Sequence, residues 1–130
     1  MDVELIKRAV KKENVFAVVG ASNNPVKYGY RIYKDLKENG YKVYPINPRE
    51  AEIQGDKAYP NISALPEKPN VVDIVTPPAV TEKIVEEAVK EKIEIVWMQP
   101  GAESEKAIEY AKNNGLGVIH GACIMIERKV

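Results

Sequence analysis

The stretch VFAVVGASNNPVKYGYR, residues 15–31, decides the fold that we predict for this chain. It opens with five consecutive apolar residues, Val15–Val19, which is typical of a strand buried on both faces in a parallel sheet. Gly20 and a loop of small and polar residues follow, and a helical pattern begins near Tyr28. This order brings free backbone N–H groups and the positive end of a helix dipole together. The stretch therefore predicts a phosphate-binding loop.

Length and composition restrict the function classes open to the chain. With 130 residues, we expect residues 1–130 to form a single domain. The formal net charge is zero, so no overall field attracts nucleic acid or an anionic membrane surface. No apolar run approaches the roughly 20 residues that cross a bilayer, and no signal peptide opens the chain. We therefore expect a cytoplasmic protein with neither nucleic acid nor membrane as its partner.

Two features of the composition point to the environment of the protein. A single cysteine, Cys123, excludes an internal disulfide and fits a reducing cytoplasm. Lysine and glutamate dominate the charged residues, a balance found in proteins of heat-adapted organisms. The composition thus suggests a thermophilic source.

The rest of the chain alternates between apolar strands and amphipathic helices. Further strands are predicted at Lys42–Ile46 and at residues 71–75, 94–98 and 116–119, with a terminal extension at 123–126. Helices are predicted at residues 28–39, 79–92 and 103–114, after a short first helix capped by Asp2. Residues 49–69, broken by glycine and prolines, predict only a short helical turn near 62–65. This alternation predicts an α/β fold: a Rossmann-like doubly wound sheet of about five parallel strands with helices on both faces.

Four predicted strands are followed by unusual loops. These loops lie at residues 20–27, 47–49, 76–78 and 99–101. The carboxyl ends of parallel strands share one edge of the sheet, and ligands of doubly wound folds bind there, where the strand order reverses. The four loops together therefore predict one binding site.

The residues of the first two loops narrow the choice of ligand. The first loop departs from the G-x-G-x-x-G fingerprint, because no glycine lies between Gly20 and Gly29. A site for NAD normally has an acidic residue after the second strand, whereas residues 47–49 read Asn-Pro-Arg. Arg49 suits a ribose that carries a phosphate, and Lys27 adds a second cation. NADP, with a 2′-phosphate, and coenzyme A (CoA), with a 3′-phosphate, both fit.

The run VFAVVGASNNPVKYGYRIYKDLKENGYKVYPINP closely resembles the opening of the small stand-alone CoA-binding proteins. These are similar to the nucleotide-binding domain of the succinyl-CoA synthetase alpha subunit. The resemblance continues through VVDIVTPPA, IVWMQPGAES and the late cysteine in HGACIMIE, and it covers nearly the whole chain after residue 14. It implies a Rossmann-like fold and CoA, or an acyl-CoA, as the ligand.

By position, the resemblance implies a role for residues in all four loops. The first loop would lie against the pyrophosphate, through Gly20, Ala21 and Ser22, with Lys27 nearby. The second would flank the adenosine and its 3′-phosphate, through Asn47, Pro48 and Arg49. The third would form a wall for the adenine or the pantetheine arm, through Thr76, Pro77 and Pro78, and Gln99 of the fourth would lie near that arm.

The sequence shows no arrangement typical of a catalytic centre. His120 and Cys123 are too few to hold a metal ion, and no paired carboxylates or nucleophile–base pair emerge. The catalytic histidine of the synthetase lies in a separate domain, so His120 inherits no role from it. Cys123 is either a small buried side chain, the reading that the sequence favours, or a thiol able to form a mixed disulfide with CoA.

The main expectation is therefore a protein that binds CoA or an acyl-CoA and carries out no chemistry alone. Two alternatives stay open. The first is an NADP-binding oxidoreductase or redox sensor. The second is the CoA-binding subunit of a larger acyl-CoA ligase, in which partner chains supply the chemistry. A homodimer and a complex with a partner subunit are both compatible with the sequence.

Overall fold

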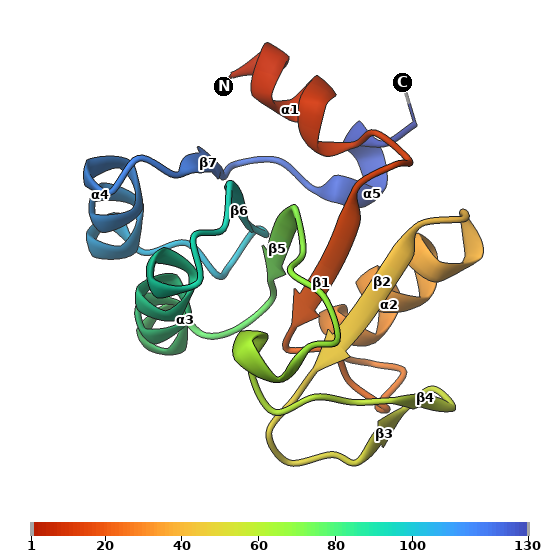
Figure 1. Cartoon of the computed structure of the whole chain (residues 1–130). Coiled ribbons are helices and arrows are strands. Elements are labelled where there is room, and N and C mark those ends of the chain that lie inside the picture. Colours follow the sequence, from red (N-terminus) through yellow and green to blue (C-terminus); the bar gives the residue numbers. More distant parts are fainter. Residues whose placement is uncertain (1, 130) are drawn as a thin grey trace.

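The computed structural model describes residues 2–129 and contains a central parallel sheet of five strands (Figure 1). The strands are β1 (Val15–Val19), β2 (Lys42–Ile46), β5 (Val71–Ile74), β6 (Ile95–Met98) and β7 (Gly117–Ile119). Their order across the sheet is β2-β1-β5-β6-β7. This is a doubly wound order, and it reverses between β1 and β5. The predicted fold class is confirmed.

Helices cover both faces of the sheet (Figure 1). One face carries α1 (Val3–Ala9), α2 (Tyr28–Glu38) and α5 (Ile124–Glu127), and the other carries α3 (Pro78–Lys90) and α4 (Glu105–Asn113). Each face has its own apolar cluster, so β5 and β6 are buried along their whole length. Burial on both sides explains why β6 is a continuous apolar run and why Asp73 alone interrupts the apolar residues of β5.

The ends of the helices follow the local signals in the sequence. Asp2 caps α1 by accepting a hydrogen bond from the Leu5 amide at 3.0 Å, as predicted. Gly40 follows α2 with φ of +84°, a conformation that favours glycine. Ser104 caps α4 through the Ala107 amide. Local chemistry therefore sets these boundaries.

Residues 49–69 contain a small hairpin that the sequence did not predict. It pairs β3 (Glu52–Ile53) with β4 (Asp56–Lys57) and is followed by the 3₁₀ turn η1 (Ile62–Ala64), close to the predicted helical turn. The two turn residues, Gln54 and Gly55, both have positive φ, as a type I′ turn requires. Strands of two residues are too short to show an alternating pattern, which explains the omission.

The last part of the chain also differs from the prediction. Residues 123–126, expected as a terminal extension, lead into the short helix α5. Arg128 fastens this helix to α2 through two hydrogen bonds to the Asp35 carboxylate, at 2.6 and 2.7 Å. A contact between residues so far apart in the sequence leaves no local pattern.

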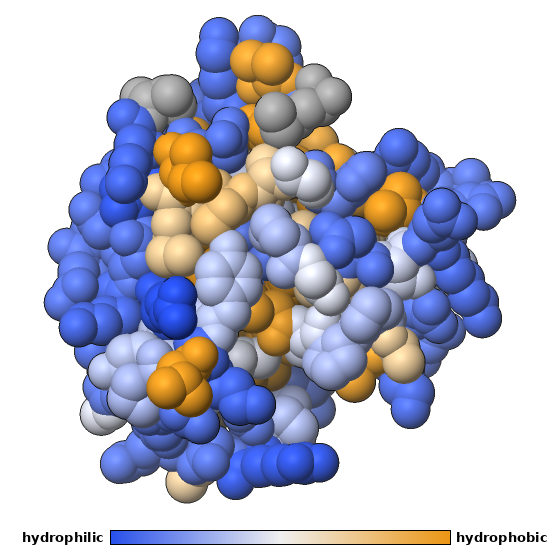
Figure 2. Space-filling view, turned by 180° about the vertical axis from the view of Figure 1, so that it is seen from behind, coloured by the Kyte–Doolittle hydropathy of each residue, from blue (hydrophilic) through white to orange (hydrophobic). Residues whose placement is uncertain are grey.

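The outer surface is largely hydrophilic. The face shown in Figure 2 has hydrophilic residues over most of its area, with apolar residues in separate spots. The most exposed large apolar side chains include Val26 and Ile126. Among the helices of residues 2–129, none combines the length and the apolar character that crossing a membrane requires.

Candidate functional site

A cavity of about 720 Å³ opens at the carboxyl ends of β1, β2, β5 and β6. It lies where the strand order reverses, the usual ligand site of a doubly wound sheet. All four predicted loops contribute to its lining. The predicted site residues that line it are Gly20, Ser22, Lys27, Asn47, Pro48, Arg49, Thr76 and Pro77.

Three further residues of the predicted site do not line this cavity. Ala21 is buried in the apolar cluster on the α2 face. Pro78 is exposed at the start of α3. Gln99 is fully buried, and its side chain donates to Asp73 at 2.6 Å and accepts from the Ile124 amide at 3.1 Å. Gln99 therefore supports the fold beside the cavity, and its contact with a ligand stays a prediction.

The first loop depends on two glycines. Gly20 has φ of +96°, and a Cβ atom there would lie 2.1 Å from the carbonyl oxygen of Val75. A Cβ atom on Gly29 would lie 1.9 Å from the carbonyl oxygen of Gly20. Any larger residue at either position would push the strands or α2 away from the loop. The two glycines thus bring the start of α2 directly against the end of β1.

Two helices begin at this cavity. The N-cap positions of α2 and α3 are Lys27 and Pro77, and within residues 2–129 neither has a side-chain cap hydrogen bond. By contrast, Asp2 and Ser104 cap α1 and α4. The first N–H groups of α2 are therefore free to bind an anion at the positive end of the helix dipole.

Asn47 joins the second loop to the first. Its Nδ2 donates to the carbonyl oxygen of Ala21 at 3.0 Å, and its Oδ1 accepts from the Arg49 amide at 2.9 Å. Both Lys27 and Arg49 are exposed and line the cavity. The structure therefore brings the two predicted cations to one site and orders the backbone beneath one of them.

The sequence did not reveal an apolar wall within the lining of the cavity. It consists of Pro60, Val80, Ile84, Pro100 and Ala102. Val80 and Ile84 lie one helical turn apart in the first half of α3, and 41% of Val80 is exposed. Their i, i+4 spacing puts them on one face of the helix, and their place directly after the Thr-Pro-Pro loop was the sequence signal that this face lies at the cavity. The wall suits a ligand that has an apolar part as well as phosphates.

Tyr28 was also missed, and it links the cavity to Cys123. Tyr28 is one of the residues that line the cavity, and its hydroxyl lies 2.6 Å from Sγ of Cys123. Burial raises the pKa of Tyr28 well above its usual value, and the hydrogen bond to Cys123 raises it further. The phenol is therefore neutral and can donate a hydrogen bond to the sulfur.

A buried carboxyl group lies in the same region of the fold. Asp73 is fully buried in β5, and burial raises its pKa to about 7, although the hydrogen bond from Gln99 acts in the opposite direction. Oδ1 accepts that hydrogen bond, whereas Oδ2 has no partner among the residues described by the structure. Asp73 also raises the pKa of Tyr28, after burial and the contact with Cys123. An unpaired buried oxygen of this kind is costly.

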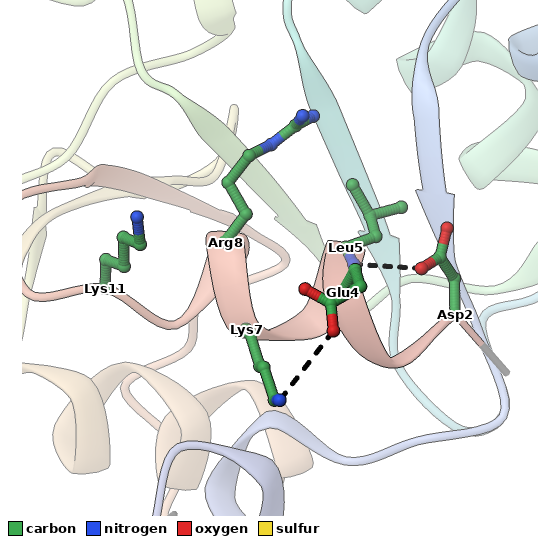
Figure 3. Close-up of a pocket in the computed structure, with 6 residues that line it drawn as sticks. All are labelled: Asp2, Glu4, Leu5, Lys7, Arg8 and Lys11. Carbon is green, nitrogen blue, oxygen red and sulfur yellow. Dashed lines mark hydrogen bonds and ion pairs between the residues drawn. The ribbon is translucent and has the colours of Figure 1, made fainter.

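Other depressions on the surface lack these features. The depression along α1 is lined by residues between Asp2 and Lys11. Figure 3 shows Lys7 and Arg8, two of these residues, pointing to opposite sides of the helix. Its basic groups therefore do not converge on one point. His120 lines a separate groove beside α1 and β7, away from the cavity at the strand ends.

The similarity to known proteins agrees with this geometry. Residues 14–129 match the family model of the CoA binding domain. A protein of Bacillus subtilis, the uncharacterized protein YneT, is 30% identical over 125 residues, which are 96% of this chain and 93% of YneT. The solved structure of a hypothetical protein from Pyrococcus horikoshii OT3 is 34% identical in sequence, and the match covers 99% of this chain and 91% of that chain, with a TM-score of 0.93.

A second kind of relative is much longer than this chain. The alpha subunit of ADP-forming acetate–CoA ligase II from Pyrococcus furiosus is 52% identical over 62 residues. Those residues are 47% of this chain and 14% of the ligase subunit. The match over residues 14–129, together with the glycine loop and the cavity at the strand ends, shows that this chain belongs to the CoA binding domain family.

Proposed function

We propose that this protein binds CoA or an acyl-CoA in the cavity at the carboxyl ends of β1, β2, β5 and β6. The observation that carries the proposal is the composition of the cavity. Lys27 and Arg49 lie on the two loops that follow β1 and β2, and an apolar wall from α3 and the loop after β6 completes the lining. CoA has both kinds of group, because its phosphates are anionic and its pantetheine arm is largely apolar.

Energies of binding indicate that both parts of the site are needed. A helix N-terminus contributes only about 0.3–1 kcal/mol to the binding of an anion. Micromolar affinity requires about 8 kcal/mol. The start of α2 therefore cannot hold the ligand alone, and Arg49, Lys27 and burial against the apolar wall supply the rest in this proposal.

Glycine at two positions also suits this ligand. Gly20 and Gly29 let the loop backbone pack directly against the end of β5 and the start of α2. This packing would hold the loop, with Ser22, beside the first turn of α2, whose N–H groups would bind the pyrophosphate. Asn47 and Arg49, ordered by the hydrogen bond between them, would hold the 3′-phosphate of the adenosine.

Calorimetric titration with CoA, dephospho-CoA, NADP and NAD tests the proposal. We expect CoA to bind, and dephospho-CoA to bind about tenfold more weakly because it lacks the phosphate that Arg49 would contact. Tight binding of NADP without binding of CoA would overturn the proposal in favour of an oxidoreductase or redox sensor. Binding of none of the four ligands would also contradict it.

A second candidate function is a CoA-binding subunit of a larger acyl-CoA ligase. The observation that favours it is the 52% identity over 62 residues to the alpha subunit of a ligase. Purification of the tagged chain from its native cells, with mass spectrometry of what accompanies it, tests this role. A ligase chain in equal amount would support the role, whereas a homo-oligomer alone would contradict it.

A further inference from the structure

We propose that Cys123 is a thiol–disulfide exchange site for the sulfur end of the ligand, so that the protein can hold CoA as a mixed disulfide. The proposal rests on the proposed function, because it takes CoA as the ligand of the cavity. It begins from the contact of 2.6 Å between the Tyr28 hydroxyl and Sγ of Cys123. Tyr28 is one of the residues that line the cavity, and Cys123, half-buried, lies outside that lining at the other end of this contact.

Hydrogen bonds to the residues on either side of Cys123 fix its position. The Trp97 side chain donates to the carbonyl oxygen of Ala122 at 2.9 Å, and Gln99 accepts from the Ile124 amide at 3.1 Å. These two contacts hold the loop across the carboxyl end of β6. Beyond the same strand end, Pro100 and Ala102 line the cavity. Cys123 is therefore fixed at the β6 side of the site.

The distance across the sheet fits a long, linear ligand. The cations lie beyond β1 and β2, whereas Cys123 lies at β6, and β2 is separated from β6 by three strand spacings. Adjacent strands are about 4.8 Å apart, so the two ends of the site are separated by about 14 Å. A ligand with phosphates at one end and a thiol at the end of an extended arm can contact both.

A second observation at this place is the free carboxylate oxygen of Asp73. Asp73 is fully buried, Gln99 binds its Oδ1, and Oδ2 has no partner among the described residues. Gln99 also accepts from the amide of Ile124, the residue that follows Cys123, and so joins Asp73 to the loop of Cys123. A native core rarely leaves such an oxygen unpaired. The polar cluster of Tyr28, Cys123, Asp73 and Gln99 thus has more hydrogen-bonding capacity than the described residues use.

The exchange is a balanced reaction when the co-reactant is a disulfide of CoA. The thiolate of Cys123 attacks one sulfur atom of CoA disulfide, and a bond forms between Sγ and that sulfur. The original S–S bond breaks, and the second CoA leaves as a thiolate that takes up the proton released by Cys123. The cysteine is oxidised and the CoA disulfide is reduced. The Tyr28 hydroxyl keeps its proton and donates a hydrogen bond to the attacking sulfur, which stabilises the thiolate.

Intact-protein mass spectrometry after incubation with CoA disulfide tests the proposal. We expect a mass increase of one CoA less two hydrogen atoms, removed by a reductant and absent from the Cys123→Ser variant. Pantethine, the disulfide that lacks the nucleotide, serves as the matched reagent. Pantethine should react with Cys123 at least about tenfold more slowly than CoA disulfide, because it has no nucleotide phosphates to hold it in the cavity.

A competitor tests whether the nucleotide part of CoA disulfide binds in the cavity, and a second variant tests the role of the Tyr28 hydroxyl. Excess adenosine 3′,5′-bisphosphate should slow the reaction of the unmodified chain with CoA disulfide. Tyr28→Phe keeps the ring and removes the hydroxyl, so we expect about tenfold slower adduct formation. Equal rates with CoA disulfide and pantethine, or no adduct at all, would overturn the proposal.

Calorimetry under reducing conditions separates this inference from the proposed function. If reduced CoA binds to the unmodified chain and no adduct forms with the disulfide, the exchange site is wrong while CoA binding stands. If reduced CoA does not bind, the proposed function fails, and this inference fails with it.

Discussion

The carbonyl oxygen of Val75 occupies the place where a side chain at Gly20 would begin, 2.1 Å from the position of a Cβ atom. Gly20 follows β1 and Val75 follows β5, the two neighbouring strands between which the strand order reverses. The floor of the cavity is therefore a direct contact between two backbones. Glycine at position 20 allows the two strand ends to approach this closely.

The contact between Gly20 and Val75 predicts that Gly20→Ala strongly destabilises the folded protein. The new Cβ atom would meet the Val75 carbonyl, and the positive φ would be strained, so we expect a loss of about 2–4 kcal/mol in the free energy of unfolding. Gly55→Ala is the matched control, because Gly55 has φ of +84° and nothing within 4 Å. It should cost about 1 kcal/mol. Equal losses in urea titrations would refute the steric explanation.

Arg49→Ala should reduce affinity for CoA selectively. If Arg49 contacts the 3′-phosphate, the dissociation constant for CoA rises about tenfold, and that for dephospho-CoA stays unchanged. Lys106→Ala is a suitable control, since Lys106 is exposed on α4 and is not part of the cavity lining. Calorimetry on both variants checks this. A similar loss for the two ligands would assign Arg49 to a different group of CoA.

Asp73→Asn should change the pH dependence of stability. The pKa of Asp73 rises from 3.8 to about 7 on folding, so the folded state binds a proton that the unfolded state has lost. Its contribution to stability is full below pH 3.8 and falls as the pH rises towards 7. The Asn variant cannot ionise at this position, so its free energy of unfolding should lack this decline. Relative to the unmodified protein, the variant should gain stability as the pH rises towards and above 7. Denaturant titrations of both proteins from pH 4 to pH 8 measure the difference.

Asp56 provides a control of opposite sign for this experiment. Hydrogen bonds from Lys37 and Tyr33 lower the pKa of Asp56, so its contribution is present above its ordinary pKa and is lost as the pH falls. Asp56→Asn should therefore lose stability relative to the unmodified protein at neutral pH and less in acid. Parallel pH profiles for the two Asn variants would contradict the assignment of Asp73 as a buried, protonated group.

Arg128→Lys should weaken the attachment of α5 to α2. Arg128 and Asp35 are mostly buried and share two hydrogen bonds, a geometry that lysine cannot reproduce. We expect a loss of about 1–2 kcal/mol in the free energy of unfolding. Lys7→Ala breaks the exposed pair with Glu4, at 3.7 Å, and should change stability by less than about 0.5 kcal/mol. Equal effects in urea would contradict this prediction.

The sequence alone was sufficient to predict the sheet, the main helices and most of the loops that line the cavity. The apolar runs of β1, β5 and β6, the cap at Asp2 and the stop at Gly40 are local features, and local chemistry produces them. The convergence of the four loops followed from one rule, because parallel strands present their carboxyl ends at a common edge. Lys27 and Arg49 could be placed at the same site for this reason.

The tertiary structure alone decided how the rest of the site is assembled. Tyr28 and Cys123 are 95 residues apart, and the side chains of Asp73 and Gln99 are 26 apart, so no periodicity connects them. Gln99, whose contact with a ligand stays a prediction, is buried because its amide bridges Asp73 and the Ile124 backbone. Local sequence patterns specify the backbone elements, whereas contacts between distant side chains depend on how those elements pack.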